Sequence, residues 1–88
     1  MTVDAIYLEG SLLNSRDEAM EFLGRALYLP EWWGRNLDAL HDCLTEPRPV
    51  RLEICNRAAM EESFFGRRLL LVLKDSAAEN PHLELAFE

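Results

Sequence analysis

Cysteine and long apolar segments are scarce in this sequence, which argues against two classes of protein. The only cysteines among its 88 residues are Cys43 and Cys55, and both lie in apolar runs. A reduced cysteine in such a run behaves as a small core residue, so a disulfide scaffold is not indicated. No stretch reaches the roughly 18 apolar residues of a membrane-spanning helix, and residues 1–10 lack the features of a secretory leader. We expect a cytoplasmic protein with no membrane partner.

Basic residues are also few. Nine Lys and Arg stand against sixteen Asp and Glu, which gives a formal net charge of -7. A negative surface repels polyanions at long range and speeds the encounter with a basic protein. We therefore expect a basic protein partner and no direct binding of nucleic acid. Acidity that serves only solubility is the alternative.

No repeat, low-complexity tract or linker interrupts the chain, so we expect one domain over residues 1–88. The hydrophobic pattern changes period several times along it. Alternating apolar residues predict strands, and apolar residues three or four apart predict helices. The expected strands are residues 3–8, 50–55 and 82–87, and the expected helices are residues 16–28, 37–45, 57–63 and 64–79.

Polar residues mark where these helices begin. Ser15 and Glu18 fit a capping box, and Asn36 and Asn56 are suitable N-caps for the next two helices. Pro30 ends the first helix. The leucine-rich residues 69–73 could form a buried strand, but the helical spacing from Phe65 through residue 78 favours a long helix.

The resulting order is β-α-α-β-α-α-β. Strands joined through helices are most simply parallel. The predicted fold class is therefore α/β, with a three-stranded parallel sheet packed with helices. The alternation in the second and third strands indicates that one sheet face is less covered than the other.

Two helices carry acidic pairs that helix energetics disfavours. Asp38 and Asp42 lie four residues apart with His41 beside them, and like charges at this spacing cost a few tenths of a kcal/mol. Asp75 and Glu79 repeat the spacing near a helix C-terminus, where an anion costs about 0.3–1 kcal/mol. These acids are either ordinary solvated residues or a surface for a partner.

The adjacent Trp32 and Trp33 precede the first of these acidic pairs. We expect one indole to cover the core and the other to be exposed. An exposed tryptophan beside carboxylates is typical of an interface anchor.

Residues 29–45, LPEWWGRNLDALHDCLT, resemble the signature of the barstar family of ribonuclease inhibitors at nearly every position. The resemblance implies the same β-α-α-β-α-α-β fold and a protein that inhibits a nuclease and is not an enzyme. The implied partner is a basic ribonuclease or nuclease toxin, and the chain would be its antitoxin or immunity protein. We expect a monomer in the absence of the partner.

The resemblance also implies a contact surface made of the loop before the second helix, that helix, and the end of the long helix. Asp42 would enter the phosphate pocket of the nuclease, and Trp32 would take the place of a contact tyrosine. The residues of the implied surface are Trp32, Gly34, Asn36, Asp38, His41, Asp42, Asp75 and Glu79.

This sequence departs from the family pattern at two places. His41 stands where the family has tryptophan, and the connection through residues 46–48 is short and lacks a further contact aromatic. Barnase is the ribonuclease that barstar inhibits, and both departures favour a different nuclease as the partner of this chain.

The same residues admit three other interpretations. Catalysis by His41 with Asp38, or by Cys43 as a nucleophile, has poor geometry, because His41 and Cys43 lie two residues apart on a helix and face different ways, and Cys43 belongs to the apolar stripe. A metal site at Asp38, His41 and Asp42 has no further ligand nearby in sequence, so no metal or cofactor is expected. The remaining alternative is a non-inhibitory acidic interaction module with a barstar-like fold.

Overall fold

The computed structural model describes residues 5–46 and 49–88. Their elements follow the predicted order, with a short 3-10 helix, η1, added after the first strand. Val3 and Asp4 of the predicted first strand, and Pro47 and Arg48 of the short connection, lie outside the described residues. The elements are β1 (Ala5–Glu9), η1 (Gly10–Leu12), α1 (Arg16–Ala26), α2 (Leu37–Leu44), β2 (Val50–Cys55), α3 (Arg57–Glu61), α4 (Phe64–Glu79) and β3 (Leu83–Phe87).

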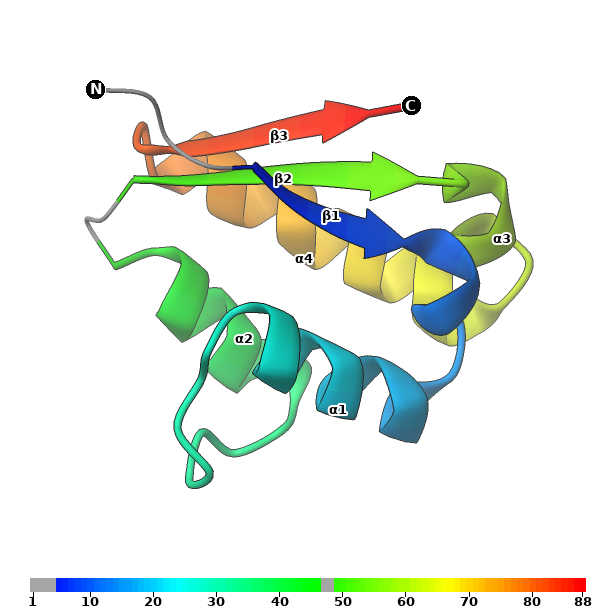
Figure 1. Cartoon of the computed structure of the whole chain (residues 1–88), viewed down its shortest axis with the longest axis horizontal. Helices are drawn as coiled ribbons and strands as arrows, with labels where there is room; N and C mark the ends of the chain where they lie inside the picture. The colour runs from blue at the N-terminus through cyan, green and yellow to red at the C-terminus, as the bar shows by residue number, and fades with distance from the viewer. Residues whose placement is uncertain (1–4, 47–48) are drawn as a thin grey trace.

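The three strands form one parallel sheet in the order β1-β2-β3, as predicted. Tyr7 lies opposite Glu53, and Glu53 lies opposite Ala86, so these side chains share one face. In Figure 1 the three arrows point the same way, and the helices lie on one side of the sheet.

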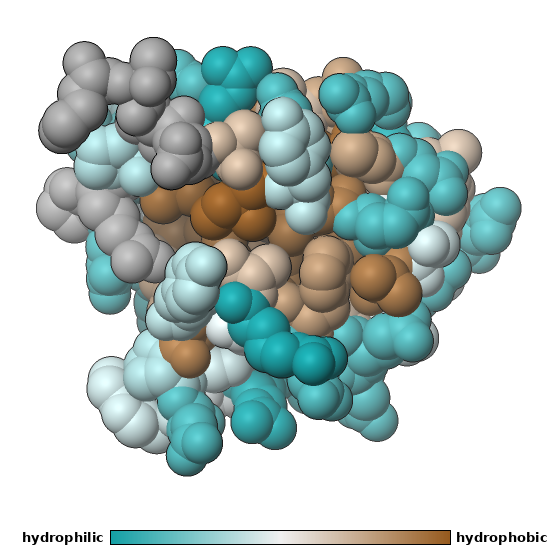
Figure 2. Space-filling model, viewed as in Figure 1, coloured by the Kyte–Doolittle hydropathy of each residue, from teal (hydrophilic) through white to brown (hydrophobic). Residues whose placement is uncertain are grey.

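The two faces of the sheet therefore differ, which confirms the expectation from the alternating strands. Leu8, Leu52 and Ile54 point toward the helices and are fully buried. On the other face Tyr7 is 63% exposed, and Arg51 is exposed beside it. Figure 2 shows the molecule from the viewpoint of Figure 1, with hydrophobic side chains gathered between the sheet and the lower helices and hydrophilic ones around the rim.

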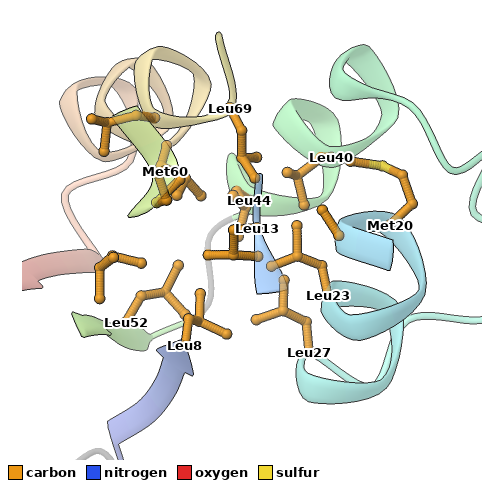
Figure 3. Close-up of a cluster of buried hydrophobic side chains, with 14 of the residues drawn as sticks. Leu8, Leu13, Met20, Leu23, Leu27, Leu40, Leu44, Leu52, Met60 and Leu69 are labelled. Atoms are coloured by element: carbon orange, nitrogen blue, oxygen red, sulfur yellow. The ribbon is translucent and has the colours of Figure 1, made fainter. Parts of the chain in front are cut away.

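Leucine and methionine side chains fill the space between the sheet and the helices. Figure 3 shows Leu8 and Leu52 of the strands facing Leu23 of α1 and Leu40 of α2. Each of these four side chains is fully buried. Burying a leucine stabilises the fold by about 1.5–3 kcal/mol, so this layer is the main source of stability and holds α2 in place.

Helix α1 ends two residues before the predicted end. Tyr28 adopts φ 55°, and its backbone N–H donates to Arg25 O while that of Leu29 donates to Gly24 O. This pair of bonds is the Schellman arrangement that closes a helix. The left-handed residue that it needs is Tyr28 here, so the helix ends before Pro30 can end it.

Of the three predicted caps, only Asn36 is confirmed. Its Oδ1 accepts a bond from the backbone N–H of Ala39 at 2.7 Å. Ser15 makes no capping bond through its side chain, so the predicted capping box is wrong. Asn56 precedes α3, but it adopts φ 57° and its amide donates to Glu9 Oε2. A left-handed backbone turns the Asn56 side chain away from the helix that follows.

The predicted helix over residues 64–79 is confirmed as α4, and the leucine run is not a strand. Ser63, which we expected at the end of the preceding helix, instead caps α4. Its Oγ accepts from the backbone N–H of Gly66 at 2.9 Å and donates to Asn14 O at 2.6 Å. Helix α3 therefore ends at Glu61.

Candidate interaction surface

The loop between α1 and α2 places its two adjacent tryptophans in different environments. Trp33 is 6% exposed, and a Cβ atom added at Gly24 of α1 would lie 3.0 Å from its Nε1. Trp32 is 84% exposed. The prediction that one indole is buried and the other exposed is therefore confirmed, and it is Trp32 that is available to a partner.

Gly34 and Asn36 set the path of this loop into α2. Gly34 has φ 92°, a conformation that L residues rarely adopt, and a Cβ there would lie 3.1 Å from that of Ala39. The Asn36 amide donates to Gly34 O at 3.2 Å, in addition to its capping bond. Both polar groups of Asn36 are thus bonded within the loop, so this residue fixes the loop and α2 relative to each other.

Helix α2 presents its two aspartates to solvent. Leu40 and Leu44 anchor its inner face in the core, which leaves Asp38 and Asp42 exposed on the outer side. Among residues 5–46 and 49–88, neither carboxylate makes a hydrogen bond or an ion pair. Like charges at this spacing disfavour the helix, and no partner among the described residues offsets that cost.

Asp42 and Trp32 line the same hollow, of about 320 Å³, which we call the aromatic hollow. Tyr28, 89% exposed, and Glu46 also line it, although the sequence did not mark them. Tyr28 reaches the surface because its left-handed backbone directs it out of α1. A tyrosine is uncommon in that conformation, so no sequence pattern could have indicated it.

The C-terminal end of α4 lies against α2. His41 Nε2 is 2.9 Å from Glu79 Oε2, and the two side chains are 32% and 60% exposed. Asp75 precedes Glu79 by one turn and is also exposed. The structure thus brings Glu79 to α2 as the predicted surface requires, but it pairs Glu79 with His41. We call Asp38, Asp42, Asp75 and Glu79 the acidic surface.

The buried side chain of Asn80 links α2 to α4 below the acidic surface. It is 3% exposed, and its Nδ2 donates to Leu44 O at 2.9 Å and to Glu46 O at 3.0 Å. Its Oδ1 accepts from the backbone N–H of His82 at 3.0 Å. Asn80 therefore joins the end of α2 to the end of α4. The sequence did not mark Asn80 as part of the contact surface.

The shifted pKa values lie elsewhere, on the open face of the sheet. The Cys55 thiol donates to Glu88 Oε2 at 3.0 Å, and this bond is the main cause that raises the pKa of Cys55 to about 11. The charge of Glu53 raises the pKa of Tyr7, and bonds from Ser11 lower the pKa of Glu9. These are effects of neighbouring carboxylates and hydrogen bonds on groups that are exposed, as in Tyr7, or half-buried, as in Glu9 and Cys55.

Within residues 5–46 and 49–88, neither a cluster of metal-ligating side chains nor a helix suited to cross a membrane is found. No group of three or more His, Cys, Asp and Glu side chains there is placed to hold a metal ion. No helix in the same ranges is long and apolar enough to cross a membrane. The acidic surface offers the exposed carboxylates of Asp38, Asp42 and Asp75, together with Glu79 in contact with His41, and Trp32 is exposed in the preceding loop.

Comparison with known proteins finds one family whose sequence model matches this chain. The family model described as Barstar (barnase inhibitor) matches residues 3–87. That range includes every helix and strand of the structure, with both ends of the acidic surface. No curated protein matches the chain.

Proposed function

The chain belongs to the barstar family, and we propose that it inhibits a ribonuclease by occupying the active site with its acidic surface. The observation that carries this proposal is the position of Asp42. Its exposed carboxylate has no partner among the described residues and shares the aromatic hollow with the exposed Trp32. A carboxylate and an indole that are both presented to solvent provide a charged contact and an apolar anchor.

The mechanism follows from what a ribonuclease must contain. Its active site collects cationic and hydrogen-bonding groups around the scissile phosphate of RNA. A carboxylate held where a phosphate would lie makes the same charge-assisted bonds. In this proposal Asp42 is that carboxylate, and the chain blocks RNA by occupying the site without any chemical step of its own.

The other residues of the surface have supporting roles. Asp38, Asp75 and Glu79 attract the basic nuclease and pair with cations at the rim of its cleft. Trp32 packs against the cleft wall and excludes water, while Gly34 and Asn36 hold its loop in position. His41 orients Glu79 through the contact of 2.9 Å between its Nε2 and Glu79 Oε2.

The partner is a basic ribonuclease or nuclease toxin that differs from barnase, and the chain is its antitoxin or immunity protein. The imidazole of His41 next to Glu79 supports a partner of different shape, because it is smaller and more polar than the indole that the family has there. The inhibitor is a monomer in the absence of the nuclease and acts in the cytoplasm.

The test begins with capture of the nuclease from the native host with the chain as bait. Its RNA cleavage is then measured against increasing amounts of the chain and of its Asp42→Ala variant. We expect Asp42→Ala to weaken inhibition by at least about 2 kcal/mol, roughly thirtyfold, because it removes the central charged contact. Glu79→Ala should cost far less, because Glu79 lies at the rim.

Asp17→Ala is the matched control, since Asp17 is an exposed aspartate in the first turn of α1. It makes the same change in net charge outside the acidic surface. Equal inhibition by the Asp42→Ala and Asp17→Ala variants would show that only overall charge matters and would contradict the proposed role of Asp42.

A second candidate is a non-inhibitory interaction module that binds another basic protein. The contact between His41 and Glu79 favours it, because it engages a carboxylate that the inhibitor would otherwise offer to the nuclease. Co-expression separates the two candidates. An inhibitor relieves the toxicity of the captured nuclease in cells, whereas a module of this kind leaves the toxicity unchanged.

A further inference from the structure

A second hollow of about 300 Å³ lies between the first turns of α1, α2 and α4. Arg16 comes from α1, Leu37 and Asp38 from α2, and Phe64 and Arg68 from α4. These helices begin far apart in the sequence, so only the folded chain brings the five residues together. We call this hollow the arginine notch.

The charge of the arginine notch is opposite to that of the rest of the molecule. Its lining carries two arginines and one aspartate, whereas the whole chain has a net charge of -7. Arg25, Arg51 and Arg57 all pair with glutamates. Arg16 and Arg68 form no ion pair within residues 5–46 and 49–88, as is also true of Arg35 and Arg67 outside the notch.

The notch also has an apolar rim. Phe64 is 69% exposed, and the guanidinium of Arg68 lies 5.8 Å from the centre of its ring. Leu71, one turn after Arg68 on α4, is also 60% exposed, although it does not line the notch. An exposed aromatic ring beside guanidinium groups without carboxylate partners suits an apolar side chain flanked by carboxylates.

We propose that the arginine notch is a second contact region for the nuclease, and this inference rests on the proposed function. It receives a segment of the nuclease outside the catalytic cleft, in which acidic residues flank an aromatic or aliphatic side chain. The carboxylates of the segment pair with Arg16 and Arg68, and its apolar side chain packs on Phe64.

Continuity of the surface and charge complementarity both support this occupant. Asn36 and Asp38 line the notch and also belong to the predicted contact surface, so a nuclease that covers Asp38 extends over the notch. A basic surface at that position would be repelled by two guanidinium groups. The notch therefore selects nucleases that carry an acidic segment beside a basic cleft, which is discrimination by repulsion as well as by attraction.

The first experiment uses a defined peptide as the probe. Acetyl-Asp-Asp-Phe-Asp-Asp-amide is titrated into the isotopically labelled chain, and amide chemical shifts are followed by NMR. We expect shifts at residues 16, 37 and 64–68 with a Kd of about 1 mM, typical of a few charge-assisted contacts. The peptide acetyl-Lys-Lys-Phe-Lys-Lys-amide is the control, and equal binding of both peptides at the notch would overturn the proposal.

Variants assign the binding to the two arginines. Arg16→Ala combined with Arg68→Ala should abolish the shifts caused by the acidic peptide, while Asp42→Ala should leave them unchanged. Arg25→Ala combined with Arg67→Ala removes the same charge outside the notch and should also leave them unchanged. Thermal unfolding of each variant verifies that it is folded.

The second experiment measures the affinity for the captured nuclease. Loss of two arginines makes the chain more acidic, so general attraction to a basic nuclease should increase for both double variants. We expect the notch variant instead to bind at least about tenfold more weakly, opposite in sign to that general effect. Unchanged or tighter binding by the notch variant would overturn the proposal.

Asp42→Ala in the same assay separates this inference from the proposed function. If Asp42→Ala weakens binding and the notch variant does not, only the notch proposal is wrong. If the chain captures no nuclease at all, the proposed function fails, and the notch loses its proposed occupant as well.

Discussion

At the scale of single residues, Trp32 and Trp33 are neighbours with different consequences for the molecule. Trp33 lies in the core, so Trp33→Ala should lower the free energy of unfolding by about 3–5 kcal/mol. Trp32→Ala removes an exposed side chain and should change it by less than about 0.5 kcal/mol. Urea unfolding followed by circular dichroism measures both. Equal losses for the two variants would contradict the assignment of Trp33 to the core.

The sequence could predict that this pair is divided between core and surface, because a chain this short has little interior for two indoles. It could not predict the exposure of Tyr28 or the bonds of Asn80. Tyr28 depends on a left-handed backbone that tyrosine rarely adopts. Asn80 bonds to Leu44 and Glu46, which are distant in sequence, so its role depends on how α2 and α4 pack.

A second residue prediction concerns Cys55. Its pKa of about 11 lies above the ordinary 9.0, so less thiolate is present at pH 8 than in an ordinary cysteine. Since the thiolate is the nucleophile, iodoacetamide should alkylate Cys55 slowly. Glu88→Gln removes the negative acceptor, lowers this pKa and should speed alkylation by at least about tenfold at pH 8.

Peptide mass spectrometry measures the alkylation of Cys55 separately from that of Cys43. Glu84→Gln is the control, because Glu84 lies on the same open face and pairs with Arg51. The explanation is wrong if both glutamine variants react at the rate of the original chain.

At the scale of elements, the serines that precede α1 and α4 give a matched test of helix capping. Ser63 accepts a bond from Gly66 N at the start of α4, whereas Ser15 at the start of α1 makes no such bond. Ser63→Ala should therefore destabilise the chain by about 1 kcal/mol, within the range of 0.5–2 for a lost cap. Ser15→Ala should cost clearly less.

Thermal and urea unfolding of both serine variants measure this difference. Ser63 also donates to Asn14 O, which adds to its expected loss. An equal loss at the two positions would mean that the capping bond contributes nothing measurable to α4.

The elements were predictable where a single period governs a segment. Residues 50–55 alternate in polarity, and β2 has the predicted bounds. The leucine-rich residues 69–73 were predicted to be helical because the apolar pattern around them extends beyond the length of a typical strand. Element ends were less predictable, because Tyr28 ends α1 through its backbone conformation and Ser63 belongs to α4 instead of the preceding helix. Such choices depend on contacts between segments and not on local pattern.

At the scale of the whole molecule, the net charge of -7 should govern how quickly a basic partner is found. The screening length falls from about 10 Å at 0.1 M salt to about 3 Å at 1 M. We expect the association rate with the captured nuclease to fall at least about tenfold between roughly 0.05 M and 0.5 M NaCl. The dissociation rate should change much less, because close contacts are screened weakly.

Stopped-flow mixing measures the association rate, and surface plasmon resonance the dissociation rate. Sodium chloride replaced by sucrose at equal osmolarity is the control for effects other than screening. An association rate that is insensitive to salt would mean that long-range attraction does not direct the encounter.

The whole fold was predictable because strands separated by helices leave few arrangements other than a parallel sheet. Part of the candidate surface followed from the resemblance to the barstar family. The arginine notch did not, because Arg16 and Arg68 lie in separate helices and carry no shared motif. Only the packing of three helix starts creates it.

Helix α4 carries a notch residue in its first turns and an acidic residue in its last turns. Eleven positions separate Phe64 from Asp75 and also Arg68 from Glu79, which at 1.5 Å per residue is about 16 Å. The length of α4 therefore fixes the distance between the positively charged arginine notch and the negatively charged acidic surface. A nuclease with both matching features at another separation could engage one patch or the other, and chains of this family with a lengthened or shortened α4 would recognise differently proportioned enzymes.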